Sequence, residues 1–249
     1  MMAKLFCVSD IHGYFNEFKA ALDKAGFDEN NSEHWLISLG DEWDRGKQPL
    51  EVMKFLSGLE RKVIIRGNHT QLFEDLCLRG YPEYHDKSNG TLDTVKIIGD
   101  YSLDKEFDLC CERAYNKTRK FRNNMVNYFE TKNYIFVHSF LPLTKTPAGT
   151  IFNHDWRFSS QKEWNESMWG NPYQLSQQGY LPDKTLVFGH FHTSYPRYKY
   201  HGEHEWGPLA DFDPYYGDGY IAIDACTAYS RQVNVLVLED EFISDKNNV

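Results

Sequence analysis

The chain is 249 residues long and carries 27 Lys and Arg against 36 Asp and Glu, which gives a formal net charge of −9 at pH 7. Charged residues at 25% and aromatic residues at 16% are typical of a packed globular protein and exclude a largely disordered chain. The acidic balance argues against a stable nucleic-acid complex, which needs a basic surface, and no apolar run approaches the ~20 residues that cross a membrane.

The first third of the chain repeats one unit, in which an apolar strand is followed by a polar loop and an amphipathic helix. Apolar runs predict three strands, at residues 3–9, 35–39 and 63–65. Apolar residues at helical spacing predict three helices, at residues 15–26, 48–58 and 70–78. Three such units in succession predict a parallel sheet with right-handed crossovers.

Residues 81–132 differ in character from both flanks. They are polar and charged with scattered apolar pairs, and they predict two or three helices that form a cap or insertion. Later apolar runs predict strands at residues 134–137, 185–188, 219–224 and 233–238. The aromatic stretches 159–178 and 195–217 are interpreted as loops, and residues 245–249 as an irregular tail.

Polar motifs follow most of these predicted strands. Five of them contain acidic, amide or imidazole side chains: Asp10-Ile11-His12, Gly40-Asp41-Glu42-Trp43-Asp44-Arg45-Gly46, Gly67-Asn68-His69, His138-Ser139 and Gly189-His190-Phe191-His192. Open α/β sheets form their ligand sites at the carboxyl ends of strands, so these side chains are expected to converge. Such a mixture of donors suits Mn, Fe or Zn better than calcium, which prefers oxygen alone. One such motif would be weak evidence, but five in order indicate a metal site.

Cysteine usage bears on the compartment. The five cysteines are odd in number and contain no C-x-x-C pair: Cys7, Cys77, Cys110, Cys111 and Cys226. A disulfide framework and a zinc ribbon are therefore not expected, and a reducing cytoplasm fits best. The first residues also lack the apolar core and cleavage site of a secretory signal.

The motifs in this order resemble those of the calcineurin-like metallophosphoesterase superfamily. The Gly-Asp-x-x-Asp-Arg-Gly form at 40–46 is similar to its phosphoprotein phosphatase branch, which includes the bacteriophage lambda type and the symmetrical dinucleoside tetraphosphatases. The resemblance implies a four-layer αββα sandwich of two mixed sheets flanked by helices, with residues 1–249 as one metallophosphoesterase domain and 81–132 as its helical insertion. It also implies an enzyme, a metal-dependent phosphoric ester hydrolase.

The same resemblance implies a dinuclear centre. The implied ligands of the first metal are Asp10, His12 and Asp41. Asp41 would also bind the second metal, together with Asn68, His138 and His190. Because Gly189-His190-Phe191-His192 is similar to the wider superfamily's Gly-His-x-His, His192 is a further candidate ligand of the first metal; the alternative is that it only lines the cleft. The two divalent ions are expected to be Mn²⁺, with Fe, Zn or Ni as alternatives.

Catalytic roles follow from the resemblance in the same way. His69 would protonate the leaving oxygen, and Asp44 would orient that imidazole. Arg45 and Asn68 would contact the substrate phosphate, and Arg157 is offered as a second phosphate-binding arginine. The alternatives are structural: a helix cap for Asp44, a surface ion pair for Arg45, and a plain surface position for Arg157.

Three classes of function remain open. The first, which the resemblance favours, is attack of a metal-bridging hydroxide on phosphate monoesters, as in serine/threonine protein phosphatases. The second is hydrolysis of dinucleoside polyphosphates or nucleotide pyrophosphates, and the third is a non-catalytic binding module. The expected partner is a phosphorylated protein or nucleotide, and the oligomeric state is not indicated. Aromatic residues of the late loops could stack a nucleobase or simply pack a loop onto its sheet: Trp156, Trp164, Trp169, Tyr173, Tyr180, Tyr195, Tyr198, Tyr200 and Trp206.

Overall fold

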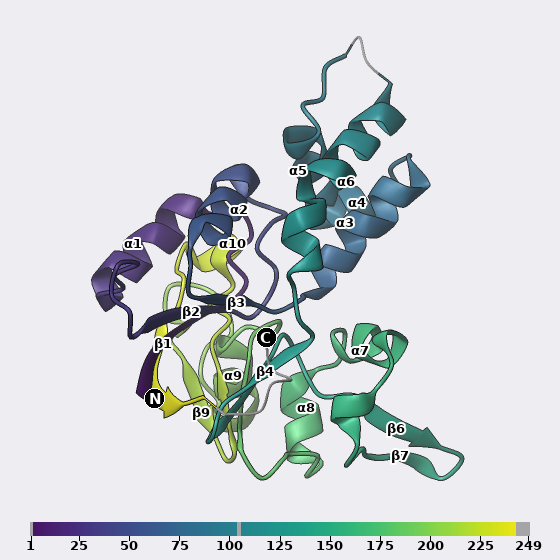
Figure 1. Cartoon of the computed structure of the whole chain (residues 1–249). Helices are drawn as coiled ribbons and strands as arrows, with labels where there is room; N and C mark the ends of the chain where they lie inside the picture. Colours follow the sequence, from purple (N-terminus) through teal and green to yellow (C-terminus); the bar gives the residue numbers. More distant parts are fainter. Residues whose placement is uncertain (1, 104–105, 243–249) are drawn as a thin grey trace.

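Two mixed β-sheets pack face to face, with helices on both outer sides (Figure 1). The computed structural model describes residues 2–103 and 106–242, so the expected tail at 245–249 lies outside it. The first sheet has the strand order β11-β1-β2-β3, from β11 (Leu236–Glu241), β1 (Met2–Val8), β2 (His34–Ser38) and β3 (Lys62–Ile64). The second has the order β4-β5-β8-β10-β9, from β4 (Tyr128–Glu130), β5 (Tyr134–Val137), β8 (Thr185–Phe188), β10 (Tyr220–Ala222) and β9 (Tyr215–Gly217).

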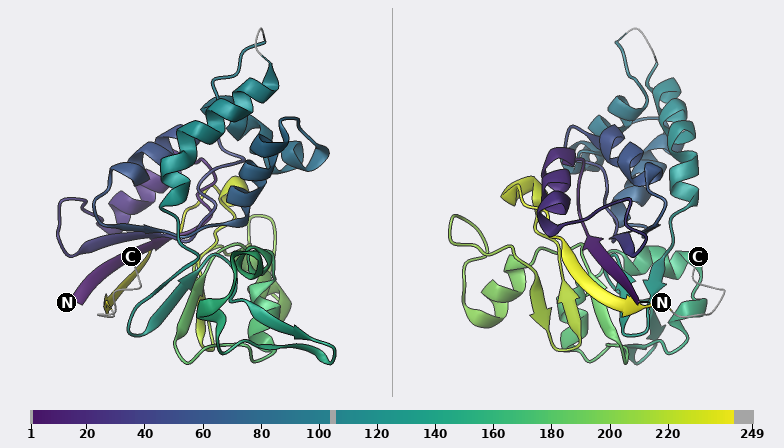
Figure 2. Two further views of the ribbon diagram at one scale, coloured as in Figure 1. Left: turned by 45° about the vertical axis from the view of Figure 1, so that its right-hand side comes forward. Right: turned by 60° about the vertical axis from the view of Figure 1, so that its left-hand side comes forward.

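The helices fall into two groups. Those on the side of the first sheet are α1 (Phe15–Ala25), α2 (Pro49–Gly58), α3 (Asn68–Arg79), α4 (Tyr84–Asn89), α5 (Thr91–Ile98) and α6 (Phe107–Asn123). Helices α3 to α6 pack on one another as a lobe that projects away from the second sheet (Figure 2). The later helices are α7 (Gln161–Ser167), α8 (Pro172–Gln177), α9 (Ser194–His201) and α10 (Thr227–Ser230), and a hairpin is formed by β6 (Leu143–Thr146) and β7 (Gly149–Phe152). Among the described residues, none of these helices has the length and apolarity needed to cross a bilayer.

Alternation along the strands creates the layers. In β1, Leu5 and Cys7 face the second sheet, whereas Phe6 and Val8 face the helices on the outer side. A third apolar cluster, which contains Phe188 of β8, covers the far side of the second sheet. Three apolar interfaces separate four layers, and the predicted αββα sandwich is confirmed.

Some expectations about local structure were wrong. The helical part of segment 81–132 ends at Asn123, and β4 follows at Tyr128–Glu130 as an antiparallel edge strand on β5. Three residues are too few for an alternating pattern to reveal a strand. The stretches 159–178 and 195–217, interpreted as loops, contain α7, α8 and most of α9. These helices are short, and α7 and α8 begin at polar N-caps, Ser160 and Asn171, rather than showing a long apolar stripe.

Parallel strands bring the polar motifs together. Strands β1, β2 and β3 run parallel in the first sheet, and β5, β8 and β10 run parallel in the second. Their carboxyl ends therefore share one edge of each sheet, where the loops that follow them meet.

Candidate active site

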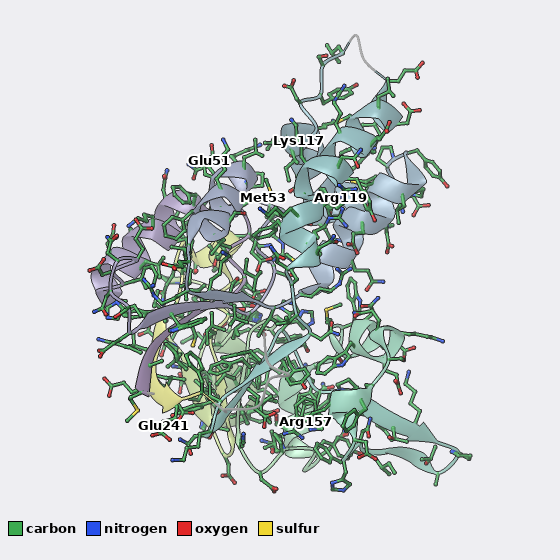
Figure 3. All side chains as sticks on the ribbon, in the orientation of Figure 1. Glu51, Met53, Lys117, Arg119, Arg157 and Glu241 are labelled. Atoms are coloured by element: carbon green, nitrogen blue, oxygen red, sulfur yellow. The ribbon has the colours of Figure 1, made fainter. Side chains whose placement is uncertain are left out.

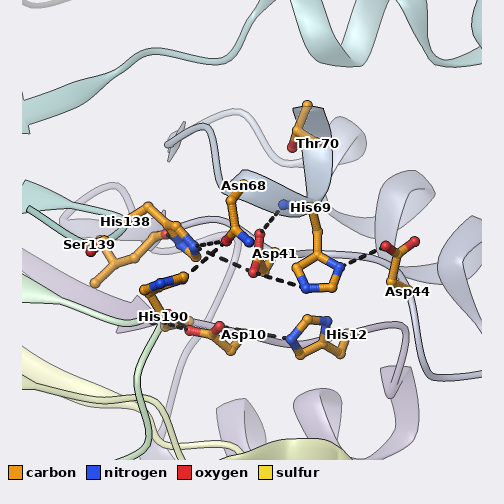
Figure 4. A network of polar contacts seen from close by, with 12 residues as sticks. Asp10, His12, Asp41, Asp44, Asn68, His69, Thr70, His138, Ser139 and His190 are labelled. Carbon is orange, nitrogen blue, oxygen red and sulfur yellow. Dashed lines mark hydrogen bonds and ion pairs between the residues drawn. The ribbon is translucent and has the colours of Figure 1, made fainter. Parts of the chain in front are cut away.

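Five loops at this edge converge on one buried cluster (Figure 4). Asp10 and His12 follow β1, Asp41 follows β2, and Asn68 and His69 form the first turn of α3 after β3. His138 follows β5 and His190 follows β8. Apart from the partly exposed His190, all of these residues are buried. The structure thus brings together seven of the predicted site residues, which lie up to 180 positions apart in the chain.

The backbone of these loops has an unusual conformation. Positive φ angles occur at six predicted site residues: Asp10 (51°), His12 (50°), Asp41 (57°), Asp44 (75°), Arg45 (65°) and His190 (65°). Non-glycine residues rarely adopt this left-handed region, and such strain concentrates at functional sites. Close approach is also needed at Gly67, where an added Cβ would lie 2.1 Å from Oδ1 of Asp41.

Asp41 lies at the centre of the cluster. Its carboxylate forms one group with His12 and His69 and a second group with His138 and His190, and within each group the potential ligand atoms lie within 4.8 Å of one another. Oδ1 of Asn68 adds a potential metal-ligand atom to the second group. It lies 2.7 Å from Nε2 of His138 and 3.1 Å from Nδ1 of His190. A carboxylate shared by two adjoining groups has the placement of a ligand that bridges two ions.

Asp10 connects the two groups at their base. Its Oδ2 accepts a hydrogen bond from the backbone N–H of His190 (2.9 Å), and its Oδ1 lies 3.8 Å from Nε2 of His12. Burial and the neighbouring Asp41 carboxylate raise the pKa of Asp10 above its usual range, although His138 opposes this. Two buried carboxylates so close together favour a cation between them.

The imidazoles are oriented as metal ligands usually are. Nδ1 of His12 donates to the carbonyl of Trp43 (3.0 Å), and Nδ1 of His138 donates to the carbonyl of Leu39 (2.7 Å). With Nδ1 bound to a carbonyl in this way, Nε2 of each ring faces the cluster and is the atom that would bind a metal ion. Burial lowers the pKa of His190 to about 3, with His138 as the next cause, so this ring is neutral at pH 7.

The carboxylates attract positive charge to the second group. Burial alone would lower the pKa of His138, but Asp41 and Asp10 outweigh it and raise the pKa to about 9. For the Asp41 carboxyl the signs are opposite: burial alone would raise its pKa, but His138 and His69 hold the pKa well below its usual range. Anionic oxygens, an amide oxygen and inward-facing imidazole nitrogens form a donor set that fits two divalent metal ions.

His69 also belongs to a second constellation, which it forms with Asp44 and Arg45 next to His12 and Asp41. Nδ1 of His69 is 2.7 Å from Oδ2 of Asp44, and its backbone N–H donates to Oδ1 of Asp41 (3.0 Å). Burial would lower the pKa of His69, but the Asp41 and Asp44 carboxylates outweigh burial and raise it. Nη1 of Arg45 is 3.0 Å from Nε2 of His12, and its Nη2 is 3.3 Å from Nε2 of His69. Because Arg45 is exposed, it marks the open side of the cluster.

Helix α5 supports this constellation from the helical lobe. Oγ1 of Thr91 donates to Oδ2 of Asp44 (2.6 Å), and the backbone N–H of Asp44 donates to Oγ1 of Thr94 (3.0 Å). A Cβ on Gly90 would lie 2.4 Å from the backbone nitrogen of Arg45, so the two backbones pack directly together. The sequence does not reveal these contacts, because nothing local marks a threonine whose partner is 47 positions away.

Removing the Thr91 hydroxyl tests this support. Thr91→Val keeps the shape of the side chain but leaves Oδ2 of Asp44 with one partner fewer, so the His69 ring is less firmly held. We expect kcat to fall roughly 10- to 150-fold, since hydrogen bonds to charged groups contribute on the order of 1.5–3 kcal/mol. The matched control is Thr118→Val, which removes a buried hydroxyl from the same lobe without touching Asp44. Equal kcat values for the two variants in steady-state assays would contradict the assignment.

Two predicted residues have other partners. Nε2 of His192 lies 3.4 Å from Oε1 of Glu205, and His192 belongs to neither of the two groups found among the described residues. Arg157 donates through Nε and Nη2 to the carboxylate of Glu130 (2.9 and 2.7 Å) and stacks on Trp156, in the half of the molecule that contains the second sheet (Figure 3). The structure therefore places both side chains outside the cluster.

Asp224 is a neighbour of the cluster that was not among the predicted site residues. It follows β10, and its side chain is buried. Burial, together with the nearby Asp10 carboxylate, holds the pKa of Asp224 well above its usual range. Its Oδ1 accepts the backbone N–H of Cys226 (2.7 Å). The rule that located the other residues, a polar side chain at the end of a strand, would also have found this one.

Adjoining His/Asp groups at the strand ends of a two-sheet sandwich have the layout of a dinuclear metal centre. The profile of the family described as calcineurin-like phosphoesterase matches residues 3–209. The chain therefore belongs to the calcineurin-like phosphoesterase family. The resemblance drawn from the sequence is confirmed.

Curated relatives carry a more specific name. The symmetrical bis(5′-nucleosyl)-tetraphosphatase of Buchnera aphidicola subsp. Baizongia pistaciae is 43% identical over 65 residues, which are 26% of this chain and 23% of that protein. The protein of the same name from Aromatoleum aromaticum is 36% identical over 66 residues, with the same shares of the two chains. The matched segment thus spans about a quarter of these relatives.

Solved structures of the same fold cover nearly the whole chain. A protein serine/threonine phosphatase from Saccharomyces cerevisiae has a TM-score of 0.54 at 14% identity, covering 98% of this chain and 82% of that one. A protein described as a diadenosine tetraphosphatase has a TM-score of 0.51 at 15% identity, covering 98% and 95%. At these identities the likeness establishes the fold alone.

Proposed function

We propose that this protein hydrolyses dinucleoside polyphosphates at the metal site described above. The observation that carries the proposal is the 36–43% identity to symmetrical bis(5′-nucleosyl)-tetraphosphatases. The sequence motifs alone favour protein phosphatase activity over this one, whereas the identity to these relatives favours the reverse order. We further propose Mn²⁺ as the metal and the cytoplasm as the location.

The proposed roles follow from the placement of the side chains. Asp10, His12 and Asp41 would hold one ion, and Asp41, Asn68, His138 and His190 the other. When bound, two such ions supply Lewis acidity and a hydroxide nucleophile at neutral pH. Asn68 coordinates without adding negative charge that would repel a phosphate.

The remaining groups act on the substrate. Arg45, at the open side, donates its N–H groups to phosphate oxygens. His69 donates the proton on Nε2 to the oxygen that leaves phosphorus, while Asp44 fixes the ring through Nδ1. Water thus supplies the new P–O bond, and the departing phosphate oxygen receives its proton from His69.

A competition between substrates tests the proposal. With Mn²⁺ supplied, we expect kcat/KM for diadenosine tetraphosphate to exceed that for a phosphoserine peptide by at least about 10²-fold, the selectivity that recognition of a second substrate group provides. Chromatography would follow nucleotide release, and phosphate release would follow the peptide. A higher kcat/KM for the peptide would support the protein phosphatase alternative. A protein with no bound metal and no Mn²⁺-stimulated turnover would support the binding-module alternative.

A further inference from the structure

Two exposed aromatic rings, Trp206 and Tyr229, stand beside the candidate site. Trp206 is 48% exposed and Tyr229 is 51% exposed, whereas Trp156, Trp164 and Tyr173 are buried in the core. Burial thus removes several aromatic residues of the late loops as candidates for ligand stacking. Trp169, Tyr198 and Tyr200 are exposed as well, so it is the contacts with the cluster, not exposure alone, that distinguish Trp206 and Tyr229. We call Trp206 and Tyr229 the aromatic pair.

One side of the aromatic pair is connected to the cluster through His192. The rings of His192 and Trp206 pack edge to face, with centroids 4.6 Å apart and planes at 86°. His192 is two residues from His190, whose backbone N–H is hydrogen-bonded to Asp10. A single side chain therefore separates the indole from the loop that carries a proposed metal ligand.

The other side is connected through the segment after β10. Tyr229 lies in α10, where its backbone N–H donates to the carbonyl of Cys226 (2.8 Å). The backbone N–H of Cys226 in turn donates to Oδ1 of Asp224, the buried neighbour of Asp10. The carbonyl of Asp224 also accepts the backbone N–H of Thr193 (2.9 Å), which joins the two segments at their base.

The aromatic pair is held in a fixed arrangement. The rings of Trp206 and Tyr229 lie 5.1 Å apart at 77°, and the backbone N–H of Gly207 donates to the Tyr229 hydroxyl (2.9 Å). The buried ring of Phe212 packs beside both, with its centroid 6.4 Å from that of Trp206 and 5.8 Å from that of Tyr229. A platform already ordered loses little conformational entropy when a flat ligand binds.

The charge beside the aromatic pair distinguishes among ligands. Oε1 of Glu205 lies 3.4 Å from Nε2 of His192, the ring that packs against Trp206. A carboxylate at this position disfavours a phosphate, which Arg45 can bind at the open side of the cluster. A neutral, flat ring has no such penalty, and aromatic side chains stack well on nucleobases.

We propose that Trp206 and Tyr229 form a binding site for one nucleobase of the substrate, with the attached phosphates extending toward Arg45 and the metal cluster. This inference rests on the proposed function, because only a nucleotide substrate would supply the base.

Calorimetric titration of the Mn²⁺-loaded protein with ADP and with inorganic pyrophosphate tests the site, since the two ligands share a diphosphate and differ in the base. We expect Trp206→Ala to raise the Kd of ADP roughly 5- to 150-fold and to change the Kd of pyrophosphate by less than about 2-fold. Trp206→Phe should retain most of the ADP affinity, because it keeps an aromatic face. Tyr229→Ala should weaken ADP binding, whereas Tyr216→Ala, a 65% exposed tyrosine on β9, should not.

The outcomes separate this inference from the proposed function. Unchanged ADP affinity in Trp206→Ala, or an equal loss for ADP and pyrophosphate, would overturn the base site. ADP binding that depends on Trp206 would support the site even if diadenosine tetraphosphate is not cleaved, and that second result would contradict the proposed function alone.

Discussion

His69→Asn is expected to lower kcat by about 10²- to 10⁴-fold while the protein retains both metal ions, because general acid catalysis contributes a factor of this size. Asn keeps the backbone N–H that His69 donates to Asp41, so the first turn of α3 should be unchanged. Steady-state assays would measure kcat, and inductively coupled plasma mass spectrometry would measure the metal content.

The leaving group supplies a second readout. Phenol is a weaker acid than para-nitrophenol, so phenolate is the poorer leaving group and depends more on a proton donor. The loss in His69→Asn should therefore be larger with phenyl phosphate than with para-nitrophenyl phosphate. The control is His154→Asn, an exposed histidine remote in sequence from the cluster motifs. Because His69 also lies within the group of His12 and Asp41, it could itself coordinate metal. Loss of metal together with activity would assign it that role instead of the acid.

Asp41→Asn is expected to remove both ions and to lower kcat by at least about 10³-fold, since metal ions contribute several kcal/mol of transition-state stabilisation. Asp41 is the one carboxylate shared by the two metal groups found in the described part of the chain. Replacing it with a neutral amide removes the negative charge that both ions would share.

Thermal unfolding provides a measurement independent of turnover. Mn²⁺ should raise the Tm of the wild-type protein, because a ligand that binds only the folded state stabilises it. The Tm of Asp41→Asn should respond little to Mn²⁺, whereas the exposed control Asp183→Asn should respond like the wild type. Retention of one ion per chain in Asp41→Asn would show that Asp41 is a terminal ligand rather than a bridge.

The sequence could predict the central strands and the polar cluster for one physical reason. Buried parallel strands are continuous apolar runs, as in β1 and β8, so the first polar residue after each run marks the edge where ligands bind. Asp10 and His190 were located in this way, and the structure places them in contact.

Other features could not be read from local patterns. The edge strand β4 owes its conformation to pairing with β5, which the sequence does not display. Helix α7 did carry a readable signal, the capping box formed by Ser160 and Glu163, and the aromatic character of the stretch obscured it. The contact between Thr91 and Asp44 depends on tertiary packing alone.

The dependence of Asp44 on α5 links catalytic competence to the integrity of a peripheral element. Local opening of α5 would release the carboxylate that orients His69 while both sheets keep their hydrogen bonds. On gradual heating, the enzyme would therefore stop working before its β-structure melts, and inactivation would report on the lobe rather than on the sandwich.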